Sequence, residues 1–459
     1  MSTRIERDSM GPMEVPADAY YGASTQRAVL NFPISSLRFT RPYIRVLGLI
    51  KMAAARVNAE LGLLDPKLAE AVQRAAREAA DGRLDDQFVV DIFQTGSGTS
   101  TNMNANEVIA NRATEILGGQ LGSKLVHPND HVNKGQSSND VIPTAIHLAA
   151  LVEIEEQLIP ALEELRAALE AKSREFWGVV KTGRTHLQDA TPIRLGQEFR
   201  GYAGQVERAR RRVTLAGEAL REVALGGTAV GTGVNTHPEF AGRVLSYVSE
   251  REKVQLSQTT NHFQAQSAID AMVEASGQLR SASISLVKVA NDIRLMGSGP
   301  RAGLGELQLP SLQPGSSIMP GKVNPVIPEA VIQVAARVVG NDATIAMAGQ
   351  WGFFELNTMF PVAGVALLQS IALLATATSV FAEKCVDGLQ ATERGPQSVE
   401  HGLSIATPLA EVVGYDRVAA IVNEALASGR TVRQVASEEL DLAPTELDRL
   451  LDARRMTGD

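Results

Sequence analysis

The chain has 459 residues, 44% of them hydrophobic, which provides for a large core and suggests two to four domains. Only 4% of the residues are aromatic, which favours closely packed helices over a β-sandwich, so the composition predicts an all-α protein. The net charge is −8 with both signs interspersed, and this excludes the basic field by which proteins neutralise nucleic acid phosphates.

The N-terminal stretch, MSTRIERDSM, has no apolar run of the kind that a secretory signal needs, so we expect a cytoplasmic protein.

The first strong periodic pattern predicts an amphipathic helix. From Ile44 to Leu61 apolar residues recur at steps of three and four, which is the spacing of one helix face. Gly62 follows directly and predicts the end of the helix.

Two polar segments further on could either cap helices or bind anions. Ser97-Gly98-Thr99 and Ser137-Ser138-Asn139 supply hydroxyl and amide groups, and the second stands before a helical run from Val141 to Leu151. A helix N-terminus also binds anions, so the two interpretations reinforce each other. Between these segments, His127 to His131 places two histidines four residues apart. Pro128 and the absence of a clear third ligand weaken a metal-site interpretation.

Two later apolar stretches predict buried helices. The pattern from Leu151 to Leu169 contains Pro160, which predicts a kink rather than an end. The stretch from Pro361 to Ala382 has no charged residue and is long enough to cross a membrane, but interrupting polar residues favour the centre of a helical bundle or a subunit interface. The single cysteine, Cys385, excludes an intramolecular disulfide framework and an iron–sulfur cluster held by several thiolates, and we expect it to be buried.

The most informative segment is GSSIMPGKVNP, from Gly315 to Pro325. It combines two hydroxyls, an ammonium and a carboxamide with glycines that allow the backbone to bend and prolines that restrict it. These groups suit a mobile loop that holds a carboxylate and works on an adjacent C–H bond. An ordinary surface turn is the alternative, since turns use the same residue types.

The motifs together resemble the fumarase/aspartase superfamily, and in particular its class II fumarate hydratases, over residues 4 to about 430. Gly321 resembles the fumarase version of the loop, where aspartases usually carry alanine. In chain order, the matching stretches are RIERDSMGP (4–12), YGASTQR (21–27), QTGSGTSTNMNANEV (94–108), VHPNDHVNKGQSSND (126–140), GRTHLQDATP (183–192), GGTAVGTGVNT (226–236), the loop at 315–325 and FELN (354–357).

The resemblance implies reversible, stereospecific hydration of fumarate to L-malate by anti addition and elimination. It implies that Ser316 is the catalytic base and that His186 activates or protonates the water in the other half-reaction. It also implies that Glu329 orients His186. Glu329 also reads as a first-turn carboxylate favoured by the helix dipole after Pro328, and both roles are compatible. The implied substrate-binding residues are Ser97, Gly98, Thr99, Ser137, Ser138, Asn139, Thr185, Ser317, Lys322, Val323 and Asn324.

The resemblance also implies an assembly and a domain plan. We expect a homotetramer of long central helical bundles with active sites shared among three subunits, no metal or other cofactor, and neither nucleic acid nor membrane as a partner. A second anion site is implied at His127, Pro128, Asn129 and Asp130. The expected domains are an N-terminal lyase domain (1–135), a central helical bundle (136–390) and a small C-terminal helical domain (391–459), with Gly395-Pro396 near the last boundary.

Two other functions remain open from the sequence. Aspartate ammonia-lyase shares the fold, the serine loop and the elimination chemistry, although Gly321, the FELN segment and the HPND segment favour water. A structural role, as in lens crystallins, is the other alternative, and the intact set of Ser316, Lys322, Asn324 and His186 speaks against it. The segment 407–415 departs from the usual fumarase pattern, which puts only the C-terminal domain in doubt.

Overall fold

The computed structural model of the protein describes residues 2–458 and is mostly helical, which confirms the all-α prediction. Within those residues, strands occur only in five two-stranded sheets. The chain divides into two compact units, while the expected three-domain division stays a prediction. Unit 1 comprises Met1–Pro160, Arg211–Ser281 and Ala336–Leu374, and unit 2 comprises Ala161–Arg210, Ala282–Ala335 and Ala375–Asp459.

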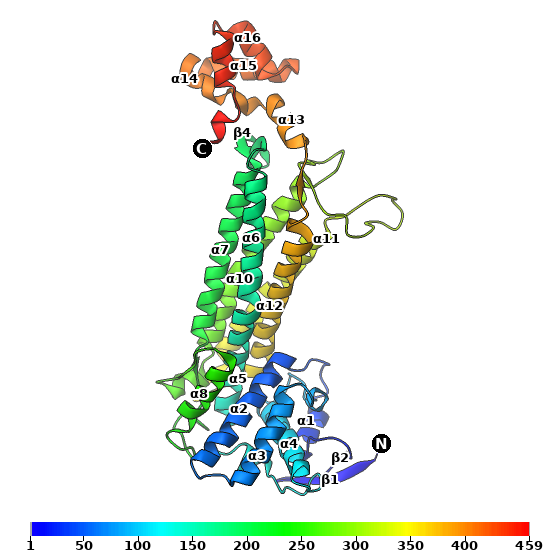
Figure 1. The fold of residues 1–459 in the computed structure, drawn as a ribbon, viewed down its shortest axis with the longest axis vertical. Helices are drawn as coiled ribbons and strands as arrows, with labels where there is room; N and C mark the ends of the chain where they lie inside the picture. Colours follow the sequence, from blue (N-terminus) through cyan, green and yellow to red (C-terminus); the bar gives the residue numbers. More distant parts are fainter. Residues whose placement is uncertain (1, 459) are drawn as a thin grey trace. The chain divides into compact units, whose positions relative to one another are not determined.

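Unit 1 is organised around closely packed helices (Figure 1). Helix α2 (Arg41–Glu60) packs against α3 (Pro66–Ala80), α5 (Ser138–Glu153) and α8 (Phe240–Glu252), and α3 packs against α4 (Thr99–Ile116). At the contact of α2 with α3, a Cβ atom on Gly48 would lie 2.9 Å from the Ala76 carbonyl oxygen, so only glycine permits this approach. Small residues thus let a chain with few aromatic side chains bury its core. The buried core between these helices includes Ala55, Ala69, Val72, Ala75, Ala76, Ile109 and Ala113.

Helix α2 ends where the sequence predicts. Its apolar stripe is buried, with Ile44, Leu47 and Val57 all less than 5% exposed. Gly62 takes a left-handed conformation with φ of 71°, and its N–H donates to the carbonyl of Ala59 at 3.0 Å. The N–H of Leu63 donates to the carbonyl of Asn58 at 2.8 Å, which completes a Schellman cap.

Pro160 does not end its helical run. A single π-helical turn, Ile154–Leu158, precedes it, and α6 then begins at Ile159 and continues to Glu175. The π-turn shifts the hydrogen-bond pattern by one residue, and π-turns and prolines are both known sources of helix irregularity. The predicted apolar face is buried throughout, including Leu151, Leu158, Leu162, Leu165 and Leu169.

The other elements of unit 1 are short. They are β1 (Thr3–Asp8), β2 (Gly11–Pro16), α1 (Ala23–Asn31), β5 (Glu222–Val223), β6 (Ser257–Gln258), α9 (His262–Ser267), β8 (Gly352–Phe353) and β9 (Leu356–Asn357). Strands β1 and β2 form an antiparallel hairpin in which Thr3 pairs with Pro16 and Asp8 with Gly11. Helix α1 begins against α4, because the buried carboxylate of Glu107 accepts the backbone N–H groups of Gly22, Ser24 and Thr25 at 2.9–3.0 Å.

Unit 2 contains an antiparallel hairpin and a group of short C-terminal helices. Strands β3 (Val180–Thr185) and β4 (Gln188–Arg194) form the hairpin. The C-terminal helices enclose a core that includes Ile421, Val435 and Leu447. Gly395 and Pro396 lie in the first turn of α13 rather than between elements. The remaining elements are β7 (Leu307–Gln308), β10 (Gln390–Ala391), α13 (Arg394–His401), α14 (Ala410–Val413), α15 (Tyr415–Ser428), α16 (Val432–Glu439) and α17 (Pro444–Leu450).

Four further long helices contribute residues to both units: α7 (Leu195–Ala219), α10 (Asp270–Met296), α11 (Val326–Ala348) and α12 (Phe360–Phe381). Within the described chain, one helical run, Phe360–Val386, is long and apolar enough to cross a membrane, and 56% of its most apolar window is buried. Its burial agrees with the interpretation as a core helix. Cys385 is also buried, as expected, and burial raises the pKa of its thiol to about 12.

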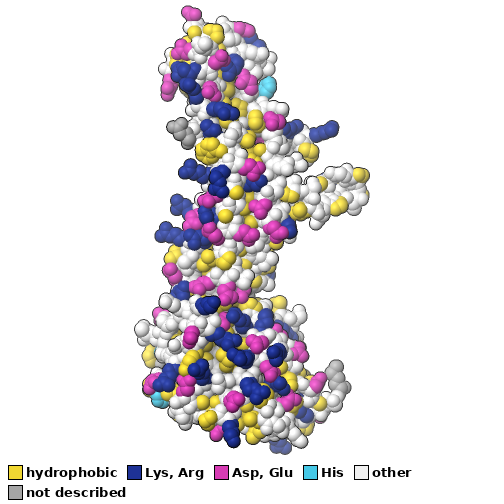
Figure 2. All heavy atoms as spheres, viewed as in Figure 1, with side chains coloured by type: hydrophobic (Ala, Val, Ile, Leu, Met, Phe, Trp, Pro, Cys, Tyr) yellow, Lys and Arg dark blue, Asp and Glu magenta, His cyan; other side chains and the backbone are white. Residues whose placement is uncertain are grey.

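Charges of both signs are mixed on the visible surface of each unit (Figure 2). Many of them form ion pairs one helical turn apart, such as Arg166 with Glu170 and Arg243 with Glu239. This arrangement agrees with the interspersed charges of the sequence.

Candidate functional site

The Ser97 to Thr99 segment forms the N-terminus of α4. Gly98 is the N-cap residue and has a left-handed φ of 77°. A Cβ atom at Gly98 would lie 2.8 Å from Cγ2 of Ile142 in α5, so this position is crowded as well as conformationally demanding. The hydroxyls of Ser97 and Thr99 are 2.8 Å apart, and Ser97 is buried. The segment therefore presents paired hydroxyls beside the start of α5.

The Ser137 to Asn139 segment caps α5, as predicted. Ser137 is the N-cap residue, and its Oγ accepts the N–H of Asn139 at 3.2 Å. Asp140 reaches back to accept the N–H of Ser137 at 2.9 Å, which forms a capping box. The Asn139 side chain donates to the carbonyl of Ala229 at 2.8 Å and so fixes the adjacent loop. The first turn of α5 is thus held rigidly from both sides.

The carboxylate of Asp140 holds the start of the glycine-rich stretch 226–236 in place. Its Oδ2 accepts the N–H groups of Gly226 at 3.1 Å and Thr228 at 3.0 Å. A Cβ atom at Gly227 would lie 2.1 Å from Oε1 of Gln266, so this glycine is required for packing. The stretch is a tightly packed turn next to α5. Burial raises the pKa of the Asp140 carboxyl, while its backbone donors oppose that shift.

A buried lysine lies behind these two helix starts. Lys51 in α2 is 0% exposed, and its Nζ donates to the side-chain oxygens of Asn102 at 2.8 Å, Asn133 at 2.9 Å and Gln136 at 3.0 Å. Burial lowers the pKa of the Lys51 ammonium to about 7. Asn102 in turn donates from Nδ2 to Oγ of Ser138 at 3.2 Å. The sequence analysis missed Lys51, although its place four residues after Leu47 on an apolar helix face is a visible signal.

The predicted second anion site lies beside a cavity in unit 1. His127 caps the π-helical turn Pro128–Val132, and its Nδ1 accepts the N–H groups of Asn129 at 3.3 Å and Asp130 at 3.1 Å. The cavity, of about 270 Å³, includes the cationic side chains Arg7 and Lys124 in its lining together with His127, Pro128 and Asn129. Carboxylates of Glu6, Asp8 and Glu107 also line it. In the described residues there is no group of three or more side chains able to hold a metal ion.

The histidine predicted to act on water lies at the tip of the β3–β4 hairpin. Thr185 pairs with Gln188, so His186 and Leu187 form a two-residue turn. Both take left-handed backbone conformations, with φ of 58° and 60°, which glycine or asparagine would adopt at lower energy. Thr185 and His186 are exposed. Strained backbone of this kind is concentrated at functional sites, so the turn supports a functional histidine.

A buried ion-pair cluster supports the hairpin. The ammonium of Lys181 lies 2.9 Å from Oε1 of Glu198 and 3.1 Å from Oε2 of Glu306. Arg184, two residues before His186, donates to the other oxygen of Glu306 at 2.8 Å. Burial raises the pKa of Glu198. Sequence reasoning gave no indication of this cluster, because its members lie up to 125 residues apart.

The loop 315–325 is closed by its own hydrogen bonds. The N–H of Gly315 donates to the carbonyl of Lys322 at 2.7 Å, and Nδ2 of Asn324 donates to the carbonyl of Gly315 at 2.7 Å. A Cβ atom at Gly315 would lie 2.6 Å from the Lys322 carbonyl oxygen, and Gly321 has φ of 80°. Both glycines are therefore required by the geometry.

Within the loop, the Ser316 hydroxyl oxygen is an acceptor. It receives the N–H groups of Ile318 at 3.2 Å and Met319 at 3.0 Å. Ser317, Lys322 and Val323 are exposed along the loop. Glu329 lies in the first turn of α11, where it faces the positive end of the helix dipole as predicted.

The predicted residues thus form three clusters. The starts of α4 and α5 meet in unit 1, while the His186 turn and the loop 315–325 both belong to unit 2. Within residues 2–458 of one chain, no hydrogen bond or ion pair joins His186 to Glu329 or to the loop.

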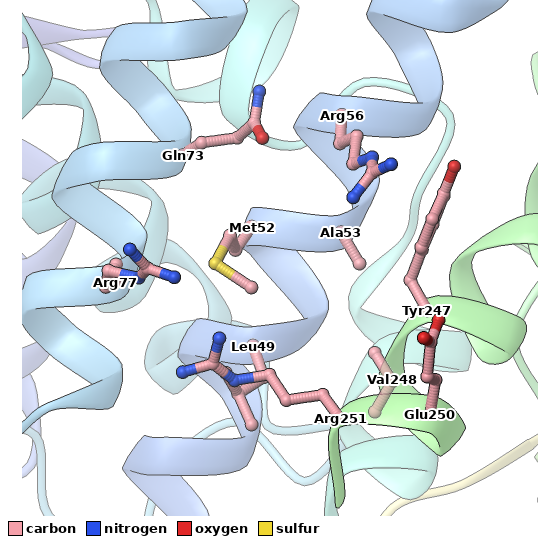
Figure 3. A pocket seen from close by; sticks show the side chains of 10 residues that line it. All are labelled: Leu49, Met52, Ala53, Arg56, Gln73, Arg77, Tyr247, Val248, Glu250 and Arg251. Atoms are coloured by element: carbon pink, nitrogen blue, oxygen red, sulfur yellow. The ribbon is translucent and has the colours of Figure 1, made fainter.

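A further cavity, of about 390 Å³, lies between α2, α3 and α8 in unit 1 and contains none of the predicted residues. Figure 3 shows Arg56, Arg77 and Arg251 around Met52 in this cavity. Arg56 is paired with Glu60 at 2.9 Å and covers the ring of Tyr247. The cavity is separate from the residues that the motifs single out.

Comparison with family models gives two matches. A model described as lyase matches residues 11–340, and a model described as the fumarase C C-terminus matches residues 405–458. The second match includes the segment 407–415, whose departure from the usual pattern does not prevent the C-terminal region from being recognised.

Named relatives match nearly the whole chain. The chain is 54% identical over 455 residues to the class II fumarate hydratase of Halobacterium salinarum, with 99% of this chain and 97% of that protein covered. It is 52% identical over 459 residues to the class II fumarate hydratase of Mycobacterium tuberculosis, with 99% and 96% covered. It is 49% identical over 461 residues to the human mitochondrial fumarate hydratase, with 100% and 90% covered.

Solved structures are similar over the same extent. The class II fumarase of Schistosoma mansoni gives a TM-score of 0.96 at 37% identity, with 100% of this chain and 99% of that chain covered. A Brucella melitensis protein described as fumarate lyase:delta crystallin, bound to cobalt, gives a TM-score of 0.95 at 47% identity, with all of both chains covered.

Proposed function

The chain belongs to the class II fumarate hydratases, a family of lyases, and we propose that it hydrates fumarate reversibly to L-malate through the three clusters described above. In the dehydration direction, a proton leaves the carbon next to one carboxylate, and hydroxide then leaves the neighbouring carbon. Proton loss places a second negative charge on that carboxylate. The site must therefore provide a base, donors for the developing charge and an acid for the departing hydroxide.

Ser316 is the proposed base, and the geometry of its oxygen carries the proposal. A serine hydroxyl is a weak base unless its ionised form is stabilised where it stands. The N–H groups of Ile318 and Met319 point at Ser316 Oγ, and these two donors would stabilise an alkoxide as well as a hydroxyl. A neutral serine in an ordinary turn uses the same bonds, so the rate of a Ser316 variant decides between the two interpretations.

Lys322 and Asn324 are proposed to stabilise the negative charge that develops on the substrate carboxylate. The Lys322 ammonium is exposed on the loop and supplies a compact positive charge. Asn324 uses one N–H to hold Gly315 and keeps its second N–H for a ligand. Ser317 and Val323 would contact the substrate from the same loop. Removal of one such donor typically lowers kcat by about 100- to 1000-fold.

The starts of α4 and α5 are the proposed cradle for substrate carboxylate. Two helix N-termini meet there, and each favours an anion through its free N–H groups and its dipole. Gly98 allows close approach of the backbone. The side chains that would donate to the carboxylate are Ser97, Thr99, Ser137, Ser138 and Asn139.

His186 is the proposed acid and base for water, with Thr185 binding substrate beside it and Glu329 orienting the imidazole. An imidazole titrates near neutrality, so it can protonate the departing hydroxide or activate the incoming water. The strained turn gives His186 a fixed and exposed position, which supports this role.

We also propose a homotetramer in which each active site combines clusters from three subunits. This arrangement follows the family and brings the unit 1 cradle together with clusters from other chains. His127 to Asp130 would form a second anion site, with Arg7 and Lys124 as further cations of its cavity. We place the enzyme in the cytoplasm and expect it to use no cofactor, nucleic acid or membrane.

The first experiment follows the ultraviolet absorbance of fumarate when purified protein meets L-malate, with L-aspartate in a parallel cuvette. Fumarate from L-malate alone is the expected result. Fumarate from L-aspartate would transfer the same residues to an ammonia-lyase. No product from either substrate would refute the proposal and favour another lyase substrate or a structural role.

A further inference from the structure

Lys51 is a buried cation with an unusual set of partners. Among residues 2–458 its ammonium makes no contact with a carboxylate and instead meets three neutral amide oxygens, those of Asn102, Asn133 and Gln136. Three acceptors match the three protons of an ammonium, whereas a neutral amine would turn its lone pair toward one of the oxygens. The buried carboxylate of Asp140 attracts the charge through space. These partners fit the protonated form of Lys51, which prevails on the acid side of its lowered pKa of about 7.

The bonds from Lys51 continue in one direction toward the proposed substrate cradle. Lys51 donates to Oδ1 of Asn102, and Nδ2 of the same amide donates to Oγ of Ser138. The other N–H of the Asn102 amide donates to Oδ1 of Asn133 at 3.2 Å, so these partners fix which side of the amide carries the oxygen and which the nitrogen. Donors aligned head to tail polarise one another, and the positive charge at the start strengthens each later bond.

The state of Ser138 follows from this chain. Because one lone pair of its oxygen accepts the hydrogen bond from Asn102, the O–H of Ser138 is turned away from Asn102 and is available to donate outward. A hydroxyl oriented in this way favours an acceptor-only group, and a carboxylate is such a group. Ser138 also lies in the first turn of α5, where the helix dipole favours the same negative charge.

We propose that Lys51 is a positioning residue for the substrate, which acts through Asn102 to hold Ser138 as a hydrogen-bond donor and places a positive charge behind the carboxylate cradle. Lys51 does not touch the substrate. The inference rests on the proposed function, in which Ser138 binds a carboxylate of fumarate or L-malate.

A purely structural role for Lys51 makes a different prediction. The ammonium could simply tie α2, α4 and the residues before α5 together, in which case its loss would lower stability and leave the affinity of folded enzyme unchanged. The two roles separate because KM does not depend on the fraction of enzyme that is folded. A structural variant has fewer active molecules with a normal KM, whereas a positioning variant has a raised KM in every molecule.

The test is a double-mutant cycle between Lys51 and Ser138. Lys51→Met, Ser138→Ala and the double variant are compared in KM for fumarate and L-malate, and in the inhibition constant of succinate, a dicarboxylate that cannot be dehydrated. We expect each single variant to raise these constants by roughly 10- to 100-fold, the range for one charge-assisted hydrogen bond. We expect the double variant to be no worse than about twofold beyond the poorer single variant, because both act through one donor.

Two further variants check that the effect passes through Asn102 and that it is specific to Lys51. Asn102→Ala cuts the chain to Ser138 but leaves Lys51 two of its acceptors, and it should raise KM as Lys51→Met does. Lys172→Met is the matched control: Lys172 is a buried lysine in unit 2 whose ammonium contacts the Leu389 carbonyl oxygen at 2.9 Å and Glu175 at 2.8 Å. Its removal should leave KM within about twofold of the wild-type value, although it too takes out a buried ammonium.

The outcomes distinguish the inference from the proposed function. Unchanged constants in Ser138→Ala would remove Ser138 from the cradle and refute the inference, while fumarate formation from L-malate by the wild type would still support the proposed function. Raised constants in Ser138→Ala beside normal constants in Lys51→Met and Asn102→Ala would refute only the role of Lys51. Effects that multiply in the double variant would also refute it, because they would show that Lys51 and Ser138 act independently.

Discussion

Arg184, two residues before His186, forms an ion pair with Glu306 in which Nη2 lies 2.8 Å from Oε1. The pair ties the β3–β4 hairpin to the segment that leads into the loop 315–325. The second oxygen of Glu306 faces Lys181 at 3.1 Å, and both of these side chains are only 2% exposed. The hairpin that presents the histidine is therefore anchored by a buried network of charges.

Glu306→Gln should destabilise the protein strongly. It leaves the buried Lys181 with one carboxylate instead of two, and breaking a buried pair costs roughly 3–5 kcal/mol. The midpoint of denaturant unfolding is the measurement. Glu239→Gln is the control, since its pair with Arg243 is exposed and contributes about 1 kcal/mol or less. Equal shifts in the two variants would contradict the assignment of Glu306 as the anchor.

Ser316→Ala should lower kcat by roughly 100- to 10,000-fold, the span expected when a general base is removed. Initial rates with L-malate measure the effect, and an unchanged melting temperature would show that the lower rate does not come from unfolding. Ser428→Ala is the control, because Ser428 lies at the end of α15, where its hydroxyl donates to the Glu424 carbonyl and accepts from Nε of Arg430. Near-normal turnover by Ser316→Ala would leave the loop as an ordinary turn.

Hybrid tetramers should recover activity that neither parent has. If the His186 turn and the Ser316 loop of one site come from different subunits, mixing His186→Asn with Ser316→Ala should restore roughly a quarter of the wild-type rate, since each cluster is intact in half of the subunits. Co-expression followed by rate measurement tests this. The control mixes Ser316→Ala with Lys322→Met, which damage the same loop and should restore nothing. No recovery in the first mixture would argue against shared sites.

Lys51 should make stability depend on pH between about 7 and 10.5. Burial lowers the pKa of its ammonium from 10.5 to about 7, so the unfolded chain holds this proton more tightly than the folded chain. The free energy of unfolding is therefore highest above about pH 10.5, decreases as the pH falls from 10.5 to 7, and changes no further below the folded pKa of about 7. Compared with Lys51→Met, the wild type should gain on the order of 1 kcal/mol per pH unit from pH 7 to 10 in denaturant unfolding. A constant difference would mean that Lys51 has an ordinary pKa.

A chelator should leave the activity unchanged. The proposed chemistry uses hydroxyl, amide, imidazole and ammonium groups, and His127 Nδ1 accepts backbone N–H groups rather than facing an open position. Rates before and after dialysis against EDTA measure this. Because the related Brucella melitensis structure is described as bound to cobalt, cobalt should be added back to the treated enzyme as well. A rate lost to EDTA and restored only by a divalent metal would overturn the metal-free mechanism.

Local signals in the sequence predicted local structure well. The end of α2 at Gly62 and the cap of α5 at Ser137 were predictable because each depends on a few consecutive residues. The chemical groups of the loop 315–325 were equally visible. Which backbone groups donate to Ser316 depends on how the loop bends, and they are the N–H groups of Ile318 and Met319.

Long-range partners could not be predicted in the same way. Lys51 meets Asn133 across 82 residues, and Arg184 meets Glu306 across 122. No local pattern specifies such pairs, because they exist only once helices and hairpins have packed. The same holds for Asp140: its bond to Ser137 is local, whereas its bonds to Gly226 and Thr228 form only when distant segments pack.

The backbone of the His186 turn has a consequence for protein engineering. Asn-Gly is the pair best suited to this two-residue turn, so a search for thermostabilising substitutions would select it in place of His186 and Leu187. That exchange would give a hairpin that folds more readily and an enzyme without its imidazole. The turn is therefore a position where selection for heat resistance and selection for turnover demand different residues, and any stabilised version of this enzyme has to gain its stability elsewhere.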